Sequence, residues 1–358
     1  MRSLFCYTMV RKRKGAAKDM KAQLTAAILS VILTLSGCHS TSRPLITPNE
    51  KVIAAVKRDE NTVTTSYTRE TKISDVIEDP VFGSYGRLLF PVDDYYYSGD
   101  TLAQLRLVYY NNIDPDMTVH ILNTLHDRAA DGGTIFYDIY TDEEKAADPD
   151  KEDTGLFFFR GEPGARFAIC NAGGAFAYVG AMQDSFPHAL TLSEAGYNAF
   201  ALIYRPGAQT ACEDLARAIA FLFEHADELE IDTSDYSLWG GSAGARMAAW
   251  VGGYGTAAFG EKDYPKPAAV IMQYTGLSEY FDDDPPTYAC VGDSDGIANW
   301  RVMQARLDGM HAIGIETEFH HYPGLGHGFG LGTGTSAEGW INDAIRFWEN
   351  QMEERAIQ

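Results

Sequence analysis

The feature that most constrains this chain is a short apolar run that leads into a serine flanked by glycines. Residues 236–239 have the composition of a buried strand, residues 240–244 are Gly-Gly-Ser-Ala-Gly, and residues 245–250 suit the start of a helix. At such a strand-to-helix turn the serine hydroxyl is exposed, and the glycines allow the sharp bend. Ser242 is therefore the candidate nucleophile, although a plain turn in a glycine-rich chain would leave the same pattern.

Three further stretches accompany the serine in a fixed order. Upstream, the strand-like residues 166–170 open into Asn171-Ala172-Gly173-Gly174. Downstream, Gly292-Asp293-Ser294-Asp295 follows another apolar run, and His327 lies in a loop of alternating glycines. Donor loop, serine, acid and histidine thus appear in the order found in α/β-hydrolases. On these motifs, residues 136–352 resemble the α/β-hydrolase superfamily, in particular its esterase branch that includes acetyl-xylan and feruloyl esterases.

The resemblance implies a catalytic triad. A serine hydroxyl is a weak nucleophile at neutral pH, so it needs a general base and a group that orients that base. His327 is the candidate base because its glycine-rich loop can carry the imidazole over the edge of the sheet. Asp295 is the candidate acid because it completes the family pattern Gly-x-x-Asp, and Asp293 is the alternative. Weaker histidine candidates are His188, His320 and His321.

The resemblance also implies an oxyanion hole, a set of N–H groups that stabilises negative charge on the carbonyl oxygen of an ester under attack. The backbone of Ala243, directly after the nucleophile, should supply one donor. Gly173 and Gly174 should supply the others, since their turn takes the place of the family's His-Gly-Gly-Gly. The sequence departs from that motif at Asn171 and Ala172, and a simple turn is the alternative.

Alternating strands and helices predict an α/β-hydrolase fold, with a mostly parallel central sheet covered by helices on both faces. We predict a catalytic domain over residues 134–358 and, packed against it, an N-terminal extension over residues 72–133. Strands are expected at residues 136–140, 156–159, 166–170, 197–204, 236–239, 268–274, 286–291 and 316–322.

Several helix starts are also predicted. Asp114-Pro115 suits an N-cap followed by proline in the first turn. Residues 210–213 and 335–338 have capping-box spacing. Residues 142–153 are acidic and are expected to form a solvated loop, since they lack the glycine of a calcium-binding loop. Tyrosines and acids at residues 93–97 could stack on a sugar, or lie half-buried at a domain seam.

The N-terminus has the pattern of an export signal. A basic region precedes a mostly apolar stretch at residues 24–37, which is shorter than the roughly 20 residues of a membrane span. Leu35-Ser36-Gly37-Cys38 resembles a bacterial lipobox, which implies cleavage after residue 37, lipidation of Cys38 and attachment to the cell envelope. An ordinary signal peptide is the alternative, and Met20 could be the true start. Residues 38–71 would be a tether and lead-in.

Net charge and the spacing of cysteines and glycines limit the classes of partner and cofactor that we expect. The net charge is −21, and removal of the basic leader would leave the rest more acidic still, which disfavours nucleic acid and anionic lipid. Cys170, Cys212 and Cys290 lack metal-binding spacing, so we expect buried thiols. The glycines after residue 324 never form Gly-x-Gly-x-x-Gly, and no cofactor is implied.

These patterns predict a lipid-anchored serine esterase that removes short acyl groups, acetyl or feruloyl, from a glycan or small-molecule ester. A serine peptidase of the same fold is the second possibility, although no propeller-like region precedes the hydrolase segment. A non-catalytic glycan-binding lipoprotein is the third, but such a protein has no need of all four site elements.

Overall fold

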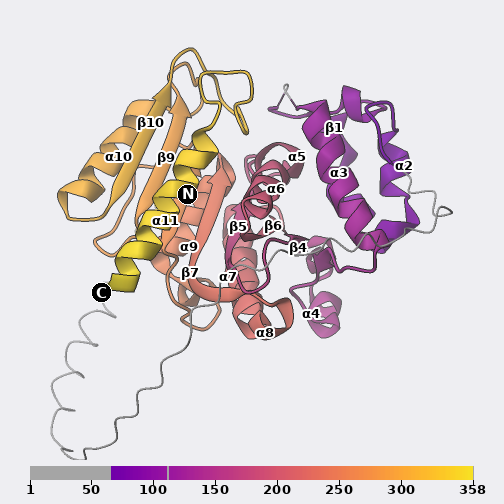
Figure 1. Ribbon diagram of the computed structural model, residues 1–358, viewed down its shortest axis with the longest axis horizontal. Helices are drawn as coiled ribbons and strands as arrows, with labels where there is room; N and C mark the ends of the chain where they lie inside the picture. Colours follow the sequence, from indigo (N-terminus) through magenta and orange to yellow (C-terminus); the bar gives the residue numbers. More distant parts are fainter. Residues whose placement is uncertain (1–65, 111–112, 358) are drawn as a thin grey trace, which may run out of the picture. The chain divides into compact units, whose positions relative to one another are not determined.

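A computed structural model describes residues 66–110 and 113–357, which lie in one compact unit, Val63–Gln358. Its main sheet, as far as the described residues show, has eight strands in the order β10-β9-β8-β7-β5-β6-β4-β3 (Figure 1). Pairing is parallel from β6 to β10 and antiparallel for β4 and β3. The bounds are β3 (Phe136–Tyr137), β4 (Gly155–Phe159), β5 (Arg166–Asn171), β6 (Asn198–Ile203), β7 (Asp232–Gly241), β8 (Ala269–Gln273), β9 (Thr287–Gly292) and β10 (Thr317–Tyr322).

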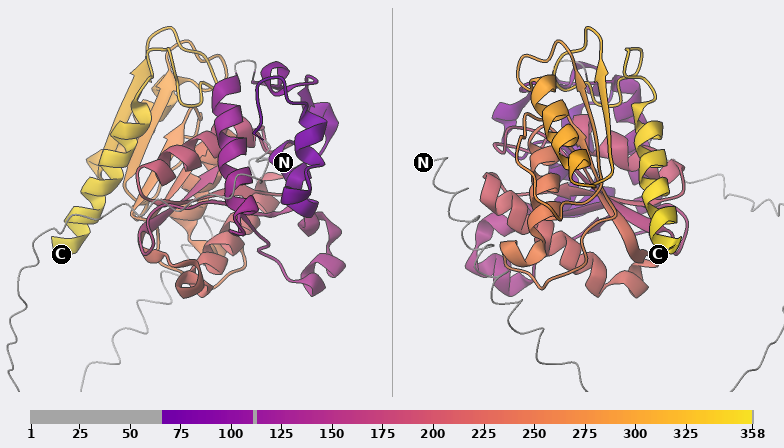
Figure 2. Two further views of the ribbon diagram at one scale, coloured as in Figure 1. Left: turned by 45° about the vertical axis from the view of Figure 1, so that its right-hand side comes forward. Right: turned by 90° about the vertical axis from the view of Figure 1, so that its left-hand side faces the viewer.

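Helices cover both faces of this sheet. In the sheet, β6 lies on one side of β5 and β7 lies on the other, so the connection from β5 to β6 and the connection from β6 to β7 cross the sheet in opposite directions. Because connections between parallel strands are right-handed, the helices of these two connections lie on opposite faces of the sheet. The first face carries α6 (Phe186–Glu194) and α11 (Trp340–Ile357), whose His188 and Trp340 rings lie 5.4 Å apart. The other carries α7 (Ala208–Glu224), α9 (Ala243–Tyr254) and α10 (Trp300–Ala312), and Figure 2 shows strands between α10 and α11.

Burial on both faces explains the near-continuous apolar strands. Every residue of β4, β6, β8 and β9 is buried. Phe158 of β4 stacks on Phe200 of β6 with ring centroids 4.3 Å apart. The predicted mostly parallel sheet with two covered faces is confirmed. The three cysteines Cys170, Cys212 and Cys290 are buried thiols, as expected.

The part before β3 is built of short elements. Its longest helix, α3 (Pro115–Ala130), begins as predicted, since the Asp114 carboxylate accepts from the N–H groups of Asp116 and Met117. The other short elements of the chain are α2 (Ile73–Ile77), η1 (Pro80–Leu89), η2 (Asp94–Tyr96), β1 (Tyr97–Ser98), η3 (Leu102–Gln104), β2 (Arg106–Leu107), α4 (Asp142–Ala147), η4 (Pro149–Asp153), α5 (Ala181–Asp184), α8 (Ala226–Leu229) and η5 (Thr256–Phe259). Within the described ranges, no helix combines the length and apolar character needed to cross a membrane.

Three local predictions were wrong. Residues 142–153 form α4 and η4, and the capping box of α4 is made by Thr141 and Glu144. Helix α7 begins at Ala208, so the Thr210 hydroxyl bonds back to the carbonyl of Pro206 rather than capping the helix. Helix α11 begins at Trp340, beyond the predicted cap, and residues 335–338 form a turn instead.

The lead-in is better packed than expected where it is described. Tyr67 is buried, and its backbone N–H donates to the Asn123 side chain at 2.7 Å. The prediction of poor packing relied on the polarity and weak hydrophobic periodicity of this segment, and neither property indicates a contact with a residue 56 positions away. The predicted signal segment 1–37, Cys38 and the start of the predicted tether lie outside the described residues.

Candidate active site

Ser242 occupies the turn between β7 and α9, at the edge of the sheet where the parallel strands end. Its backbone has φ 52° and ψ −112°, a conformation that costs energy for a residue with a Cβ atom. Gly240 and Gly244 permit this turn: a Cβ on Gly240 would lie 2.5 Å from the Ala245 nitrogen, and one on Gly244 would lie 2.7 Å from the Ala172 oxygen. The predicted strand, tight turn and helix around the serine are confirmed.

The structure brings His327 and Asp295 to this serine. His327 Nε2 lies 3.0 Å from Ser242 Oγ, and His327 Nδ1 lies 2.8 Å from Asp295 Oδ2. Because an ionised carboxylate can only accept, Nδ1 carries the proton and Nε2 is free to accept from the serine. The Asp295 side chain is fully buried, and its Oδ1 accepts the backbone N–H groups of Ile297 and Ala298.

The alternatives to these two residues lie elsewhere. Asp293 is exposed, and its carboxylate accepts from Ser294 and from the N–H of Gly324. His320 Nε2 bonds to Glu318, and His321 stacks on the Trp300 ring at 4.6 Å. His188 is buried in α6. Among the proposed bases and acids, the geometry therefore joins His327 and Asp295 to Ser242.

Two glutamines hold the loop that carries His327. Gln183 donates to the Gly328 carbonyl and Gln273 donates to the Gly330 carbonyl, each at 2.9 Å. Gly328 and Gly330 have φ values of 73° and 55°, in the region that favours glycine. The alternating glycines thus serve the backbone path of the loop, and the glutamine bonds fix where its histidine stands.

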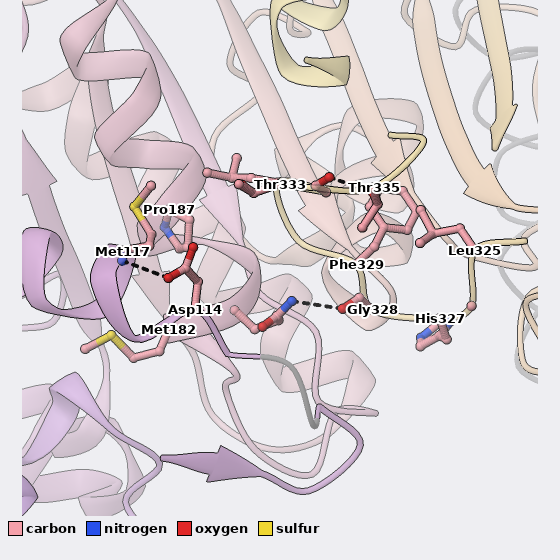
Figure 3. A pocket seen from close by; sticks show the side chains of 14 residues that line it. Asp114, Met117, Met182, Pro187, Leu325, His327, Gly328, Phe329, Thr333 and Thr335 are labelled. Carbon is pink, nitrogen blue, oxygen red and sulfur yellow. Dashed lines mark hydrogen bonds between the residues drawn. The ribbon is translucent and has the colours of Figure 1, made fainter. Parts of the chain in front are cut away.

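A pocket of about 220 Å³ opens beside His327. Figure 3 shows Met117 and Met182 on one side of it and Leu325 and Phe329 on the other. Met117 belongs to α3, so the N-terminal extension contributes directly to this wall. The volume is below the roughly 300 Å³ at which typical ligand pockets begin, and its lining includes His327 but not Ser242.

Of the three backbone N–H groups expected to form the oxyanion hole, one already donates to another side chain. Ala243 is the first residue of α9, so its N–H has no partner within the helix. Gly174, at φ 129°, lies in the turn that follows β5. The Gly173 N–H, however, donates to Asp184 Oδ2 at 3.0 Å. The structure therefore gives the Gly173 N–H a different partner from the expected one and leaves Ala243 and Gly174 as the candidate donors.

Asn171, where the sequence departs from the family motif, has a structural role. Its side-chain amide donates to the Trp239 carbonyl at 2.8 Å and is buried. This bond ties the end of β5 to β7, the strand that carries the serine. The departure at Asn171 thus supports the turn below the site.

Sequence reasoning missed Asp184, a fully buried acid in α5. Besides the Gly173 bond, its carboxylate accepts from the Tyr110 hydroxyl at 2.6 Å and from the Tyr274 hydroxyl at 2.5 Å. Burial raises the pKa of Asp184, while these three bonds act in the opposite direction. A motif search offers no signal for such a cluster, because its partners come from distant parts of the chain.

The Asp184 carboxylate fits here because two of its neighbours, Gly173 and Gly241, are glycines without a Cβ atom. A Cβ on Gly173 would lie 2.6 Å from Asp184 Oδ2, and one on Gly241 would lie 2.8 Å from the same atom. Gly241 directly precedes the nucleophile. In the described part of the chain, no group of three or more His, Cys, Asp or Glu side chains is arranged to hold a metal ion.

Comparison with known proteins supports the architecture. Residues 162–275, less than half of the chain, match the BD-FAE family model. No curated protein sequence matches the chain. Among solved structures, an acetyl ester-xyloside bifunctional hydrolase from Caldicellulosiruptor lactoaceticus is similar, with a TM-score of 0.53 and 19% identity over 60% of this chain and 95% of the other.

Two further structures are similar over slightly less of the chain. Esterase 2 from Thermogutta terrifontis, with propionate bound, has a TM-score of 0.48 and 20% identity over 55% of this chain and 89% of its own. The α/β hydrolase MGS-M1 from a Medee basin deep-sea metagenome library has a TM-score of 0.47 and 18% identity over 56% of this chain and 93% of its own. Together with the strand order and the serine turn, the likeness to the Caldicellulosiruptor enzyme shows that the chain has the α/β-hydrolase fold.

Proposed function

We propose that this protein is a serine esterase that removes short acyl groups by way of an acyl-enzyme. The observation that carries the proposal is the continuous hydrogen-bond chain from Ser242 through His327 to Asp295. A hydroxyl, an imidazole and a buried carboxylate in this order are what nucleophilic catalysis by serine requires.

In the proposed reaction, Ser242 Oγ attacks the ester carbonyl carbon while His327 Nε2 takes the hydroxyl proton. The carbonyl oxygen becomes an oxyanion that the N–H groups of Ala243 and Gly174 stabilise. When this tetrahedral intermediate breaks down, the bond between the carbonyl carbon and the alcohol oxygen is cleaved, and the alcohol leaves with the proton from His327. Water then attacks the acyl-enzyme by the same route, releasing the acid and restoring Ser242. Asp295 orients the imidazole and stabilises its protonated form throughout.

The substrate class we propose is a polysaccharide or small-molecule ester with a short acyl group, in keeping with the small pocket that His327 helps to line. We propose an acetyl or feruloyl ester on a glycan because the motifs resemble those of acetyl-xylan and feruloyl esterases and the N-terminus has the pattern of an export signal. The acidic net charge of −21 suits a neutral substrate better than an anionic one.

The test is hydrolysis of p-nitrophenyl esters of increasing chain length by the full chain, with Ser242→Ala as the matched control. We expect activity to be greatest on the acetate and to be lost, by at least about 10³-fold, in the variant. A fluorophosphonate probe should label the wild-type protein at Ser242. Ester turnover that survives in Ser242→Ala would refute the mechanism, and peptide turnover exceeding ester turnover would favour a peptidase.

We also propose that lipid on Cys38 anchors the protein to the bacterial cell envelope, since Leu35-Ser36-Gly37-Cys38 has the form of a lipobox. A lipid anchor needs no spanning helix. Incorporation of labelled palmitate into the full chain in a bacterial host, and its loss in Cys38→Ser, tests this. Equal labelling of both proteins would contradict it.

A further inference from the structure

Resting on the esterase function proposed above, we propose that Asp184 is a positioning residue of the same site. Its carboxylate holds the turn that carries the Gly174 donor, and its negative charge attracts the positive charge that the imidazole gains during acyl transfer. The proposal rests on the three hydrogen bonds that converge on Asp184 and on the contact of Tyr274 with the catalytic histidine.

The first step of the argument is the turn. Asp184 Oδ2 accepts the Gly173 N–H at 3.0 Å, and the Gly173 carbonyl accepts the Gly180 N–H at 2.9 Å. A Cβ built on Gly173 would lie 2.9 Å from Ser242 Cβ, so this turn touches the nucleophile. Without the carboxylate, the buried Gly173 N–H would lose its partner, and the position of the adjacent Gly174 N–H would no longer be fixed.

The second step is the charge. The hydroxyls of Tyr110 and Tyr274 and the Gly173 N–H all donate to Asp184, which favours the ionised carboxylate. The Tyr274 ring also packs edge-on against the His327 ring, with centroids 5.0 Å apart. Burial raises the pKa of Asp184, and His327 is among the groups that oppose this rise. Only Tyr274 separates the carboxylate from the ring, so a negative charge on Asp184 attracts the positive charge that the imidazole gains when it takes the serine proton.

The buried tyrosines and His188 around this pair carry no charge at neutral pH. Burial raises the pKa of Tyr110, Tyr274, Tyr178 and Tyr204, so these hydroxyls stay neutral. Burial lowers the pKa of His188, on the helix after Asp184, to about 4, so this ring is neutral at pH 7. The Asp295 carboxylate bonds to His327 Nδ1 directly, so it acts on the ring in addition to Asp184.

The position of the charge is consistent with the chemistry. In acyl transfer the imidazole gains a proton as the oxyanion forms, so a charge that favours the imidazolium lowers the barrier. Repulsion between Asp184 and the oxyanion is reduced because three donors already occupy the carboxylate. The net effect should therefore appear in kcat rather than in KM.

The experiment compares Asp184→Asn with Asp184→Ala in the full chain. In Asn, Oδ1 can still accept from Gly173 and Tyr110, while its NH₂ can donate to the Tyr274 hydroxyl. Asn therefore keeps the support for the turn and removes the charge, whereas Ala removes both. With p-nitrophenyl acetate, we expect kcat to fall about tenfold in Asn and at least about 10²-fold in Ala, with KM nearly unchanged.

The decisive measurement is the pH profile of kcat/KM. Loss of a negative charge near His327 disfavours the imidazolium, so the acid limb should move to lower pH by about half a unit to one unit in Asp184→Asn. A purely structural role for Asp184 would lower the rate without moving this limb. Thermal unfolding of each variant shows whether the comparison is between folded proteins.

The outcomes separate this inference from the proposed function. If the wild type is active, Ser242→Ala is inactive and folded Asp184→Asn has an unshifted acid limb, the inference is wrong and the esterase stands. If the wild type hydrolyses no ester, both fail. If Asp184→Asn does not fold, Tyr274→Phe provides the test: it removes one donor, Asp184 binds a proton more readily, and a smaller shift in the same direction is expected. An unshifted limb there would overturn the inference.

Discussion

Two acids with buried side chains lie near His327, the proposed general base, and the structure holds them in different ways. Asp295 is held by its own neighbours, since Oδ1 accepts the N–H groups of the residues two and three positions later. Asp184 is held by Tyr110 and Tyr274, which lie 74 and 90 residues away in the sequence. The first arrangement depends on a local turn and leaves a recognisable pattern. The second depends on the packing of three separate segments and leaves none.

The two acids also differ in what they contact. Asp295 bonds directly to the imidazole, so it decides which ring nitrogen carries the proton. Asp184 is linked to the same ring through Tyr274 and to Ser242 through Gly173. A direct partner should matter more to the rate than an indirect one, and substitutions at each position measure the difference.

The largest effect is expected from Asp295→Asn. The two backbone N–H groups that bond Oδ1 would hold the Asn carbonyl in that place, so the NH₂ group would face His327 Nδ1. Nδ1 must then accept, Nε2 carries the proton, and the ring cannot take the proton of Ser242. We expect kcat on p-nitrophenyl acetate to fall by about 10⁴-fold.

The matched control is Asp293→Asn. This acid is two residues away and exposed, and it does not bond to His327. Its kcat should stay close to that of the wild type. A loss for Asp295→Asn no greater than the roughly tenfold loss expected for Asp184→Asn would mean that the two acids are equivalent, contrary to the comparison.

The next largest effect is expected from Gly173→Ala, which tests the turn between Asp184 and Ser242. The new methyl group would lie 2.6 Å from Asp184 Oδ2 and 2.9 Å from Ser242 Cβ, so the turn must shift. Displacement of an oxyanion donor should lower kcat by about 10² to 10³-fold. Steady-state kinetics on the acetate ester measures this.

Gly276→Ala is the control for that substitution, since its nearest neighbour, the Arg246 guanidinium, would lie 3.8 Å from the new methyl group. It should change kcat little. Activity of Gly173→Ala within a factor of about two of the wild type would show that the turn tolerates displacement, and the structural argument for Asp184 would weaken with it.

The smallest expected effect concerns the interior beside Asp184. Burial lowers the pKa of His188 from 6.5 to about 4, so between these pH values the unfolded chain binds a proton that the folded chain refuses. Acidification through this window therefore lowers the free energy of unfolding, by up to about 3 kcal/mol. In His188→Leu this contribution is absent, and stability should fall less steeply.

Urea unfolding of both proteins at pH 7, 5.5 and 4.5 gives the two slopes, and baseline differences between the proteins cancel in this comparison. If the free energy of unfolding of the wild type falls with pH no more steeply than that of His188→Leu, water or protons reach the buried region around His188. That result would also remove the basis for a dry environment around Asp184.

The helix starts show how far local patterns can be trusted. Asp114-Pro115 predicted the start of α3 correctly because an N-cap acts on the two or three N–H groups that follow it. The capping-box spacing at residues 335–338 predicted the start of α11 wrongly. There, the Glu338 carboxylate accepts the Gly334 N–H and so stabilises a turn before the helix. The same residues can satisfy the backbone of a turn or of a helix, and tertiary packing selects between them.

The oxyanion turn shows a second limit. From the sequence, Gly173 and Gly174 were equivalent donors, since both lie in the turn of the family motif. The structure distinguishes them because a buried carboxylate accepts from one of the two. No spacing along the chain predicts this, as Asp184 itself is fixed by Tyr110 and Tyr274.

The sequence by itself determined the fold class, the serine turn and the residues that could form the triad. These depend on short-range physics: apolar runs for buried strands, glycines where the backbone bends sharply, and an acid and a histidine that follow particular strands. Tertiary structure alone decided that the Gly173 N–H is engaged and that Asp184 bonds to it together with Tyr110 and Tyr274. Each of these outcomes depends on contacts between segments far apart in the chain, whose energies no local pattern contains.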